Sequence, residues 1–510
     1  KMTLLQKIEQ YKEDIEELQS QLNVLNGDSK PLIWSIEFAE IFAEKSGFDI
    51  IIGNPPYVRQ EDIADPTGYI KEKKCYKNLL TEMVKLDTKE LEVPVINISG
   101  KSDLYTYFYV RTISLLNTKG IHTFICSNSW LDVEYGVWLQ KYLLENCSIE
   151  LIIDNQAKRS FKSADVNTLI SIIHPVKLKN ENHLTKFVAF RKPFEEAVYT
   201  ENMIQIETAE RVKSNDTYRM YPITTEELYE EGLERTGNEV NASFRTEYKG
   251  DKWGSKYLSS PENLIKLMRS LNFELVRLSS VYESSQRNNL KILDKRDKAS
   301  SIIKIPYLKS IKKVDKIYTK SCELIDKYET QSNNVKNMII PDIISNRFIS
   351  DRLFFLRGGN YAVSDTFFLI RLHPEYDADH VCLLLNSTIS LYFIEIVGRK
   401  NLGGGLLTFY GYELRMHYFP NPRLVTYTKE LIQVYKNISR RAIKSIFEEC
   451  GIDPESEIPI EDQDPKPLPD RAELDKAVFD VLGLTESERK DVYRGVCRLV
   501  WNRSSKARNV

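Results

Sequence analysis

The sequence predicts an α/β fold built on a mostly parallel, doubly wound sheet. Short, continuously apolar runs alternate with longer segments of helical periodicity, and polar loops separate the two. Apolar runs without polar alternation are typical of strands buried on both faces, and their alternation with helices predicts parallel pairing. The expected strands are FDIII (48–52), IHTFIC (121–126), IELIID (149–154) and TLISII (168–173). The expected helices between them cover 103–116 and 130–146.

Residues 1–30 are expected to form a coiled-coil-like helix ahead of the first strand. Apolar residues recur from Leu4 to Leu25 at alternating spacings of four and three, with Glu and Lys on the other faces. This heptad pattern predicts one long helix that packs in a hairpin or against a partner. The polar Asn26-Gly27-Asp28 turn ends it. We assign the segment a structural role and no chemistry.

Three further regions follow this helix. Residues 31–200 carry the alternating strands and helices, and residues 201–425 carry many short β-like runs that are rich in aromatic and basic residues. Residues 426–510 read as helical around an acidic, proline-rich linker at 451–470. The linker is expected to be too polar to bury a core.

The last forty or so residues predict a small helical hairpin. Gly483 is placed to end the first helix and Thr485 to cap the second.

Composition excludes some classes of protein. Hydrophobic residues make up 42% and charged residues 28% of the chain, and no run approaches the roughly 18 apolar residues of a membrane helix. The first residues contain no apolar signal segment, and the seven cysteines form no CxxC pair. We therefore expect no disulfide framework, no metal site, no membrane partner and a cytoplasmic location.

Charge is distributed unevenly although the formal net charge is only −2. Residues 286–320 contain eleven Lys or Arg against three acids, whereas residues 448–475 contain eleven acids against two bases. A local basic stretch suits a phosphate backbone. Solvated faces that balance each other for solubility are the plain alternative.

The most specific feature is Asn54-Pro55-Pro56-Tyr57, which directly follows the first apolar strand. Ligands of doubly wound sheets bind beyond the carboxyl ends of strands, and this segment is expected at such an end. The structural alternative is a stiff turn, because two prolines restrict the backbone to extended conformations.

FDIIIGNPPYVR (48–59) resembles motif IV of the amino-methyltransferases, in the gamma-class motif order of adenine-specific DNA enzymes. Segments 103–120 and 122–131 are similar to the family's following motifs. The later region resembles the fused target-recognition domains of type IIG restriction–modification proteins, at 305–310, 341–348 and 399–414.

The resemblance covers most of the chain from about residue 30. It implies the carboxyl-terminal half of a doubly wound methyltransferase sheet over 31–200, an α+β DNA-recognition domain over 201–425, and a helical tail over 426–510. The implied function is site-specific methylation of adenine N6 in DNA within a restriction–modification system.

The residues of the motif suit the chemistry that the resemblance implies. The exocyclic amine of adenine is a poor nucleophile because its lone pair is delocalised into the ring. The side-chain oxygen of Asn54 and the carbonyl of Pro55 can accept its two hydrogens and free that lone pair. Tyr57 can stack on the flipped base. By the resemblance of Ser160-Phe161 and the strand that follows to the family's base-packing loop, Phe161 closes the other face. A core aromatic is the alternative role for Phe161.

The implied methyl donor is S-adenosylmethionine. By the resemblance, Asn54, Pro56, Tyr105 and Phe108 lie toward this cofactor. The glycine-rich loop that grips the adenosine should precede motif IV in this class, yet no GxG occurs before Asn54. We therefore expect that an amino-terminal half is missing or that a second polypeptide supplies it, and a nuclease domain is a further candidate partner.

Double-stranded DNA is the expected substrate and partner. Candidate phosphate contacts are basic residues of the central region, namely Lys309, Lys312, Lys313, Arg347, Arg399 and Lys400. The glycines at 403–405 suit either close approach to DNA or a plain tight turn.

Two rival functions stay open at this point. One is a methyltransferase with the same motif that acts on a protein glutamine or an RNA guanine, although such a reading leaves the long basic and aromatic region unused. The other is a DNA-specificity or interaction module without autonomous activity.

Overall fold

The structure is a computed structural model, and it describes most of the chain from Leu32 to Arg508. Its described residues are 12, 15, 32–157, 167–177, 183–236, 245–261, 264, 274–286, 302–311, 314–320, 323–324, 326–331, 338–399 and 405–508. The heptad helix expected over 1–30 therefore lies outside the described residues apart from Lys12 and Ile15. We refer to residues 32–236 as the sheet domain, 245–261 as the junction segment and 274–508 as the carboxyl-terminal domain.

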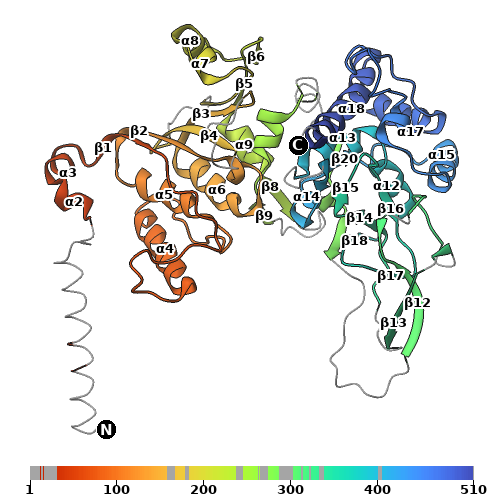
Figure 1. Cartoon of the computed structure of the whole chain (residues 1–510), viewed down its shortest axis with the longest axis horizontal. Coiled ribbons are helices and arrows are strands. Elements are labelled where there is room, and N and C mark those ends of the chain that lie inside the picture. The colour runs from red at the N-terminus through yellow and green to blue at the C-terminus, as the bar shows by residue number, and fades with distance from the viewer. Residues whose placement is uncertain are drawn as a thin grey trace.

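A mixed sheet organises the sheet domain (Figure 1). Seven described strands join it in the order β1-β2-β4-β3-β5-β7-β6. Its strands are β1 (Phe48–Gly53), β2 (Leu116–Ser127), β3 (Ser148–Asn155), β4 (Thr168–His174), β5 (Leu184–Phe190), β6 (Lys213–Ser214) and β7 (Tyr218–Thr224). All four strands expected from the apolar runs are confirmed, and the sheet continues past residue 200 through β6 and β7.

The expectation of a mostly parallel sheet is wrong. Within this sheet, only β1 with β2 and β3 with β5 pair in parallel among the described strands. The other described pairings, β2–β4, β3–β4, β5–β7 and β6–β7, are antiparallel. In the structure β4 lies between β2 and β3 and runs antiparallel to both. The physical reason is that a continuous apolar run fixes burial but not strand direction.

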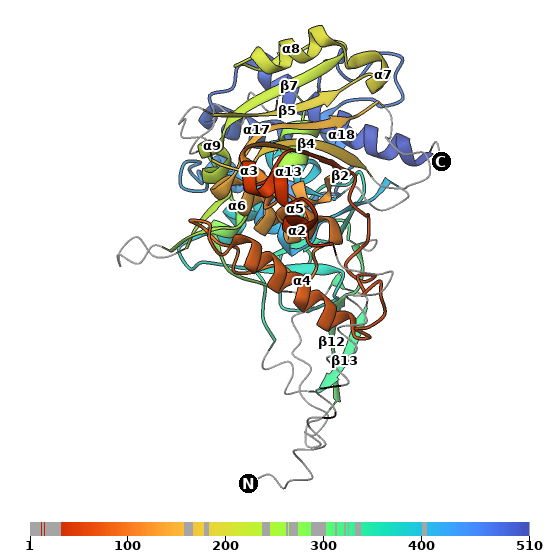
Figure 2. The same ribbon diagram turned by 90° about the vertical axis from the view of Figure 1, so that its left-hand side faces the viewer.

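Helices cover the two faces of the sheet unequally. The sheet-domain helices are α2 (Trp34–Glu37), α3 (Ala39–Lys45), α4 (Lys73–Thr88), α5 (Leu104–Ile113), η1 (Asn128–Leu131), η2 (Glu134–Gly136), α6 (Val137–Asn146), α7 (Phe194–Ala197), α8 (Thr200–Thr208) and α9 (Thr225–Glu231). On one face α4, α5 and α6 cover an aromatic-rich core. On the other face α7 and α8 pack on β5 and β7, and Figure 2 shows β2, β4, β5 and β7 following one another across the sheet towards them.

Shorter strands begin with β8 at the end of the sheet domain and continue through the junction segment and the carboxyl-terminal domain, around buried helices. The strands are β8 (Leu233–Thr236), β9 (Arg245–Tyr248), β10 (Leu275–Arg277), β11 (Tyr282–Gln286), β12 (Ile302–Leu308), β13 (Lys327–Gln331), β14 (Ile343–Asn346), β15 (Phe348–Ile349), β16 (Phe355–Arg357), β17 (Ala362–Val363), β18 (Phe367–Leu372), β19 (Leu407–Thr408) and β20 (Tyr418–Pro420). The helices are η3 (Gly254–Ser259), η4 (Leu278–Ser280), α12 (Ala378–Leu385), α13 (Thr388–Val397), α14 (Gly411–Arg415), α15 (Lys429–Arg440), α16 (Ile446–Cys450), α17 (Pro469–Val481) and α18 (Glu486–Arg508).

The largest described core lies in this carboxyl-terminal domain, around α12, α13 and α18. Figure 1 shows β12 and β13 extending away from it as an arm. Among the described residues no single helix is long and apolar enough to cross a membrane; α12 and α13 pass that test only as a pair bent by 67°.

Two expectations for the carboxyl-terminal region meet different outcomes. The final hairpin is confirmed: Gly483 has φ +63° between α17 and α18, and Thr485 and Glu488 exchange capping hydrogen bonds. The linker expected to bury no core instead contributes Ile452 and Ile460, which are 4% and 7% exposed. These two buried isoleucines outweigh the average polarity of the linker.

Candidate active site and nucleic-acid interface

The Asn54–Tyr57 segment leaves the sheet at the carboxyl end of β1. Gly53 pairs with Phe124 of β2, and a Cβ on Gly53 would lie 2.7 Å from the Phe124 ring. A side chain at this position would therefore force either the strand end or the Phe124 ring to move. Immediately beyond it, Asn54 and Pro56 are exposed whereas Pro55 is buried.

The side chains of the segment are held differently. Asn54 is exposed as a residue, and among the described residues its amide makes no hydrogen bond. Tyr57 is half-buried and its hydroxyl donates to the Ile125 carbonyl of β2 at 3.3 Å. Burial raises the pKa of Tyr57 to about 12, which keeps the phenol protonated as that donor.

A partly buried carboxylate fixes the far end of the same loop. Asp103, at the start of α5, accepts the Gln60 backbone N–H at 3.0 Å and the Tyr135 hydroxyl at 2.6 Å. The Val58 carbonyl accepts the Leu104 N–H at 3.1 Å. The loop is thus tied to α5 by main-chain and carboxylate contacts, which leave Asn54 free to meet a ligand.

Sequence reasoning missed Asp103 as the anchor of this loop. Its signal was present, because an Asp directly before a predicted helix is a common start residue. In the structure its carboxylate serves the Asn54 loop instead of capping α5.

Other strands end beside the Asn54 segment. Ser127, the last residue of β2, pairs with Thr168 at the start of β4, and Asp154 near the end of β3 pairs with Leu169. Burial raises the pKa of Asp154 to about 6. The same edge of the sheet therefore carries Asn54 and, on the following strands, two hydroxyls and a carboxyl with a raised pKa.

The residues expected to face the cofactor separate on α5. Tyr105 is buried, at 1% exposed, and its hydroxyl pairs with that of Tyr135 at 3.0 Å. Phe108 is 38% exposed on the outer side of the same helix. Phe161, expected to stack on the base, lies outside the described residues.

Two of the expected DNA contacts meet at one aromatic ring. The guanidinium carbons of Arg347 and Arg399 lie 5.0 and 5.5 Å from the ring centroid of Tyr410. Stacking of this kind orients a guanidinium and leaves its N–H groups available to an anion. Tyr410 was not expected from the sequence, although it lies within the 399–414 segment that carried the resemblance.

The other expected DNA contacts lie on or near the arm. Lys309 is exposed directly after β12, and its carbonyl accepts the Ser364 hydroxyl at 2.9 Å. Lys312, Lys313 and Lys400 lie outside the described residues. The expected set is therefore not one cluster, since Lys309 belongs to the arm and the two arginines belong to the Tyr410 site.

The junction segment joins the two domains through buried charges. Lys252 pairs with Glu413 of the carboxyl-terminal domain at 3.1 Å. Lys256 pairs with Glu231 of the sheet domain at 2.5 Å and with Asp251 of the junction segment itself at 3.0 Å. Burial by itself would raise the pKa of Glu413, but Lys252 and Arg399 more than offset it and hold that pKa below its ordinary value. Nothing in the sequence pattern marked these residues, because buried pairing joins positions far apart in the chain.

The polar backbone of this junction is also satisfied. The Gln140 amide donates to the carbonyls of Leu131 and Asp251 at 3.1 and 3.0 Å and accepts the Asp251 N–H at 3.2 Å. One side chain of α6 therefore bonds to the η1 loop and to the junction segment at once.

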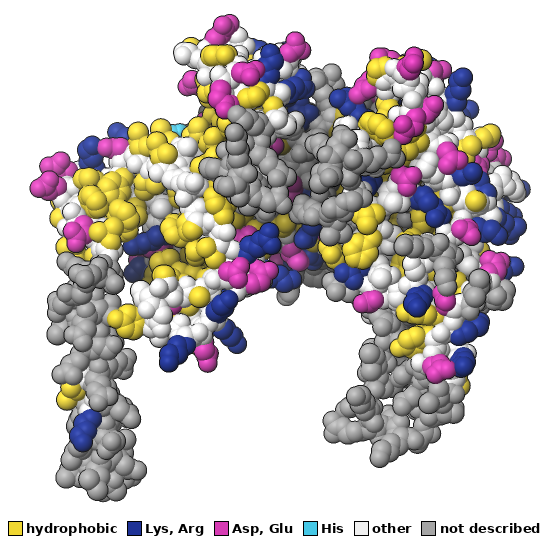
Figure 3. Space-filling view, in the orientation of Figure 1, with side chains coloured by type: hydrophobic (Ala, Val, Ile, Leu, Met, Phe, Trp, Pro, Cys, Tyr) yellow, Lys and Arg dark blue, Asp and Glu magenta, His cyan; other side chains and the backbone are white. Residues whose placement is uncertain are grey.

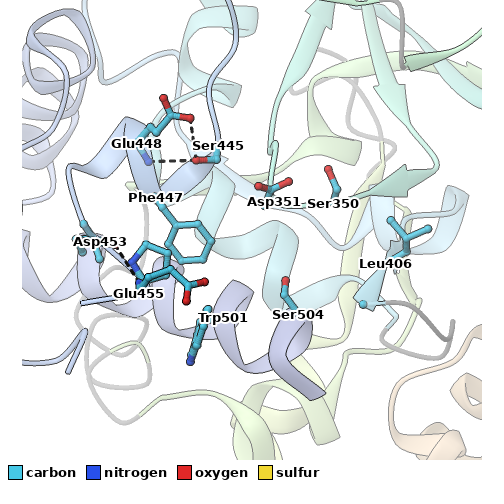
Figure 4. Close-up of a pocket in the computed structure, with 13 residues that line it drawn as sticks. Ser350, Asp351, Leu406, Ser445, Phe447, Glu448, Asp453, Glu455, Trp501 and Ser504 are labelled. Atoms are coloured by element: carbon cyan, nitrogen blue, oxygen red, sulfur yellow. Dashed lines mark hydrogen bonds between the residues drawn. The ribbon is translucent and has the colours of Figure 1, made fainter. Parts of the chain in front are cut away.

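A cavity of about 620 Å³ lies in the carboxyl-terminal domain, away from the Asn54 edge (Figure 4). Its acidic lining comes from Asp351, Glu448, Asp453 and Glu455. Figure 4 shows Phe447 and Trp501 beside these carboxylates. Four acids disfavour a phosphate backbone at this surface, so we do not count it as part of the nucleic-acid interface.

Comparison with known proteins bears on the first third of the chain. Residues 1–161, which include the Asn54–Tyr57 segment, match the family model of the Eco57I restriction-modification methylase. The chain is 29% identical over 170 residues to the Type II methyltransferase M.BstVI of Geobacillus stearothermophilus, a match covering 33% of this chain and 24% of that protein. It is 28% identical over 136 residues to the Type II restriction enzyme and methyltransferase RM.Eco57I of Escherichia coli, covering 27% of this chain and 11% of that protein.

The match thus spans well under a third of the length of these two relatives. Among solved structures, the type IIG restriction endonuclease BpuSI is similar over 90% of this chain and 54% of its own, with 11% identity and a TM-score of 0.35.

Proposed function

We propose that this protein is a site-specific DNA methyltransferase that transfers a methyl group to adenine N6 as part of a restriction–modification system. The observation that carries the proposal is Asn54, whose amide is exposed and unbonded among the described residues at the carboxyl end of β1. The family match over residues 1–161 supports the same activity.

The proposed mechanism needs position rather than a strong base. The Asn54 side-chain oxygen accepts one hydrogen of the adenine amine and the Pro55 carbonyl accepts the other, which localises the lone pair on nitrogen. Pro55 is buried and conformationally restricted, so its carbonyl is held in place. Tyr57, anchored through its hydroxyl to Ile125, offers its ring to the base. S-adenosylmethionine, when bound, supplies an electrophilic methyl group.

The described residues fit only part of that cofactor. Pro56 and Phe108 are exposed and can contact it, whereas Tyr105 supports α5 from beneath through its hydrogen bond to Tyr135. The adenosine pocket therefore requires further protein surface.

We propose that this surface belongs to an additional α/β segment that pairs with the free edge of β1. Among the described strands β1 pairs only with β2, and Ile50 and Ile52 of its uncovered face are 60% and 77% exposed. Ile33 and Ile36 beside α2 are 46% and 66% exposed. An apolar strand with an open edge is a template for strand addition, and a strand ending in a glycine-rich loop would complete the nucleoside site.

The proposed segment has a direct test. The 510-residue chain should bind S-adenosylmethionine only weakly in calorimetry, and adding the segment in trans should strengthen binding. Replacing Ile52 with Lys should abolish that gain, whereas Leu424→Lys, at an exposed apolar position far from β1, should not. Micromolar binding by the 510-residue chain alone would contradict the proposal.

The activity is tested by methyl transfer from labelled S-adenosylmethionine to unmodified genomic DNA, with the cofactor-binding segment present. Mass spectrometry of the digested DNA should find N6-methyladenine at one recurring sequence. Asn54→Ala should remove it, and Asn437→Ala, an exposed position of α15, should not. Label in protein glutamine or RNA guanine would favour the rival methyltransferase function, and DNA binding without methyl transfer would favour a specificity module.

A further inference from the structure

A second cavity, of about 540 Å³, lies where the sheet domain meets the carboxyl-terminal domain. Its charged lining comes from both sides: Lys101 and Glu134 belong to the sheet domain, and Arg399 and Arg415 to the carboxyl-terminal domain. Tyr410 also lines it. Figure 3 shows Lys and Arg side chains along the concave margin between the two domains.

The cations of this pocket outnumber the carboxylates that face them. Buried Glu413 is shared by two cations, Lys252 at 3.1 Å and Arg399 at 2.7 Å. Among the described residues, Nε is the only side-chain nitrogen of Arg399 that donates a hydrogen bond, and Lys101 forms no ion pair. Surplus positive charge in a partly enclosed site attracts an anion.

Arg415 is held in a weaker, exposed pair. It contacts Glu134 across the domain boundary at 2.6 Å, and the two side chains are 33% and 53% exposed. An exposed pair of this kind exchanges readily with a competing anion. Among the described residues, the pocket thus contains three cations that can meet an anion. Lys101 has no ion pair, Arg399 has N–H groups without a partner, and the partner of Arg415 can be displaced.

The pocket is also connected to the Asn54 loop. Lys101 lies just before Asp103, whose carboxylate accepts the Gln60 N–H. Lys77 donates to the Gly100 carbonyl and to the Gln60 side chain, both at 3.0 Å. The segment that presents Lys101 is therefore the segment that holds the base-binding loop.

We propose that this interdomain pocket binds one backbone phosphate of the duplex DNA, with Lys101, Arg399 and Arg415 as its cationic ligands. The inference rests on the proposed function, since the ligand is the DNA substrate, and it adds Lys101 and Arg415 to the interface. A phosphate seated there contacts both domains and the anchor of the Asn54 loop. Binding would align the recognised sequence with the catalytic edge.

The first test measures duplex affinity of the intact protein across salt concentrations. Lys101→Ala and Arg415→Ala should each lower the log–log salt slope by about one unit, and the double variant should lose no more than two. Lys476→Ala and Arg423→Ala are matched controls at exposed positions outside the pocket and should keep the wild-type slope.

The second test asks whether removing the charge of Glu134 strengthens or weakens DNA binding. Glu134 competes with the phosphate for Arg415, so Glu134→Gln should tighten DNA binding by roughly three- to tenfold at low salt. If the Arg415–Glu134 pair only holds the domains together, the same substitution leaves affinity unchanged or weakens it.

A third test locates the phosphate. Neutral methylphosphonates, placed one at a time around the modified adenine, should weaken wild-type binding at one position and have no effect there in the Lys101→Ala–Arg415→Ala variant. Inorganic phosphate at matched ionic strength should displace DNA better than chloride, and this advantage should disappear in the double variant. Phosphate binding to the pocket without any methylphosphonate position whose effect depends on Lys101 and Arg415 would assign the pocket to a free phosphate ion and overturn the proposal.

The outcomes separate this proposal from the proposed function. If wild-type protein binds and methylates DNA while Lys101→Ala and Arg415→Ala keep its affinity and slope, the pocket assignment is wrong and the function stands. If wild-type protein neither binds DNA nor methylates it, the proposed function itself fails.

Discussion

The Asn54 edge and the junction segment use polar side chains in opposite ways. At the edge, Asn54 has no hydrogen-bond partner among the described residues and Ile52 is 77% exposed. At the junction, Lys252 and Lys256 are nearly fully buried and both are ion-paired. The Asn54 edge thus leaves a polar side chain without a hydrogen-bond partner among the described residues. The junction segment pairs its buried charged side chains within the protein.

The difference separates the region that we propose meets ligands from the region that provides rigidity. A buried charge pair opposes domain movement, because separation would strand a charge away from water. The Asn54 loop is instead held by main-chain contacts and by Asp103, so its side chain can act on a substrate without loss of structure. Substitutions in the two regions should therefore affect different measurements.

The sharpest contrast is expected from Asn54→Ala. Loss of a hydrogen-bonding group that acts on the transition state should lower methyl transfer by about 100- to 1000-fold. Stability should stay within about 0.5 kcal/mol of wild type, because the side chain is exposed. Single-turnover kinetics and urea unfolding of the same samples measure the two effects.

A large loss of stability in Asn54→Ala would remove the contrast between the regions, since Asn54 would then be structural. Near wild-type methyl transfer would reject the mechanism.

Glu413→Ala tests the other side of the comparison. It leaves Lys252 buried without its partner and removes the carboxylate that also receives Arg399. We expect a loss of about 3–5 kcal/mol in the free energy of unfolding. Glu461→Ala, which breaks an exposed 2.8 Å pair with Arg498, should cost no more than about 1 kcal/mol. Equal effects of the two substitutions would show that the junction pairs contribute no special rigidity.

The sequence predicted local structure better than topology. The runs 48–52, 121–126, 149–154 and 168–173 all form strands, because a short apolar run bounded by polar loops has few alternatives. The direction of β4 was not encoded in its apolar run and was predicted wrongly.

Buried helices of the carboxyl-terminal domain were also missed. The sequence TISLYFIEIV of α13 is rich in β-branched and aromatic residues, and all ten of its residues are buried. It therefore shows no amphipathic period and reads as a strand.

The candidate site was predicted where it depends on neighbours in sequence. Asn54 follows its strand as expected, but Tyr105 and Phe108 had been placed on one side of their helix. Tyr105 shares its inward face with Tyr109, four residues on, while Phe108 points outward. The Tyr410 site joins positions far apart in sequence, and no local pattern could bring them together.

Gly53→Ala probes the packing that directs the Asn54 segment. The added methyl would lie 2.7 Å from the Phe124 ring, so the strand end or the ring has to move. We expect a stability loss of about 1–3 kcal/mol together with reduced methyl transfer. Gly100→Ala, where a Cβ meets no atom within 4 Å, is the matched control and should leave both nearly unchanged.

If Gly53→Ala reduces stability without changing methyl transfer, the reaction tolerates a displacement of the Asn54–Tyr57 segment. That outcome would contradict a mechanism that depends on the exact position of this segment.

The smallest expected effect concerns Asp154. This residue lies at the same edge of the sheet as Asn54, and we expect it to change the stability of the fold with pH. Burial raises its pKa to about 6 from its ordinary value of 3.8. A raised pKa in the folded state means that its stabilising contribution is complete below pH 3.8 and is lost as pH rises through 6.

At pH 8 the ionised carboxylate therefore destabilises the fold, and Asp154→Asn should increase the free energy of unfolding by about 1 kcal/mol, discounted for partial exposure. At pH 5 the gain should shrink, whereas Asp216→Asn, an exposed position of the sheet domain, should show the same small difference at both pH values. Urea unfolding at pH 5 and pH 8 measures this difference. A gain in stability for Asp154→Asn that does not change with pH would mean that the Asp154 carboxyl is ionised at both pH values. The edge of the sheet around Asp154 would then be as open to water as exposed Asn54.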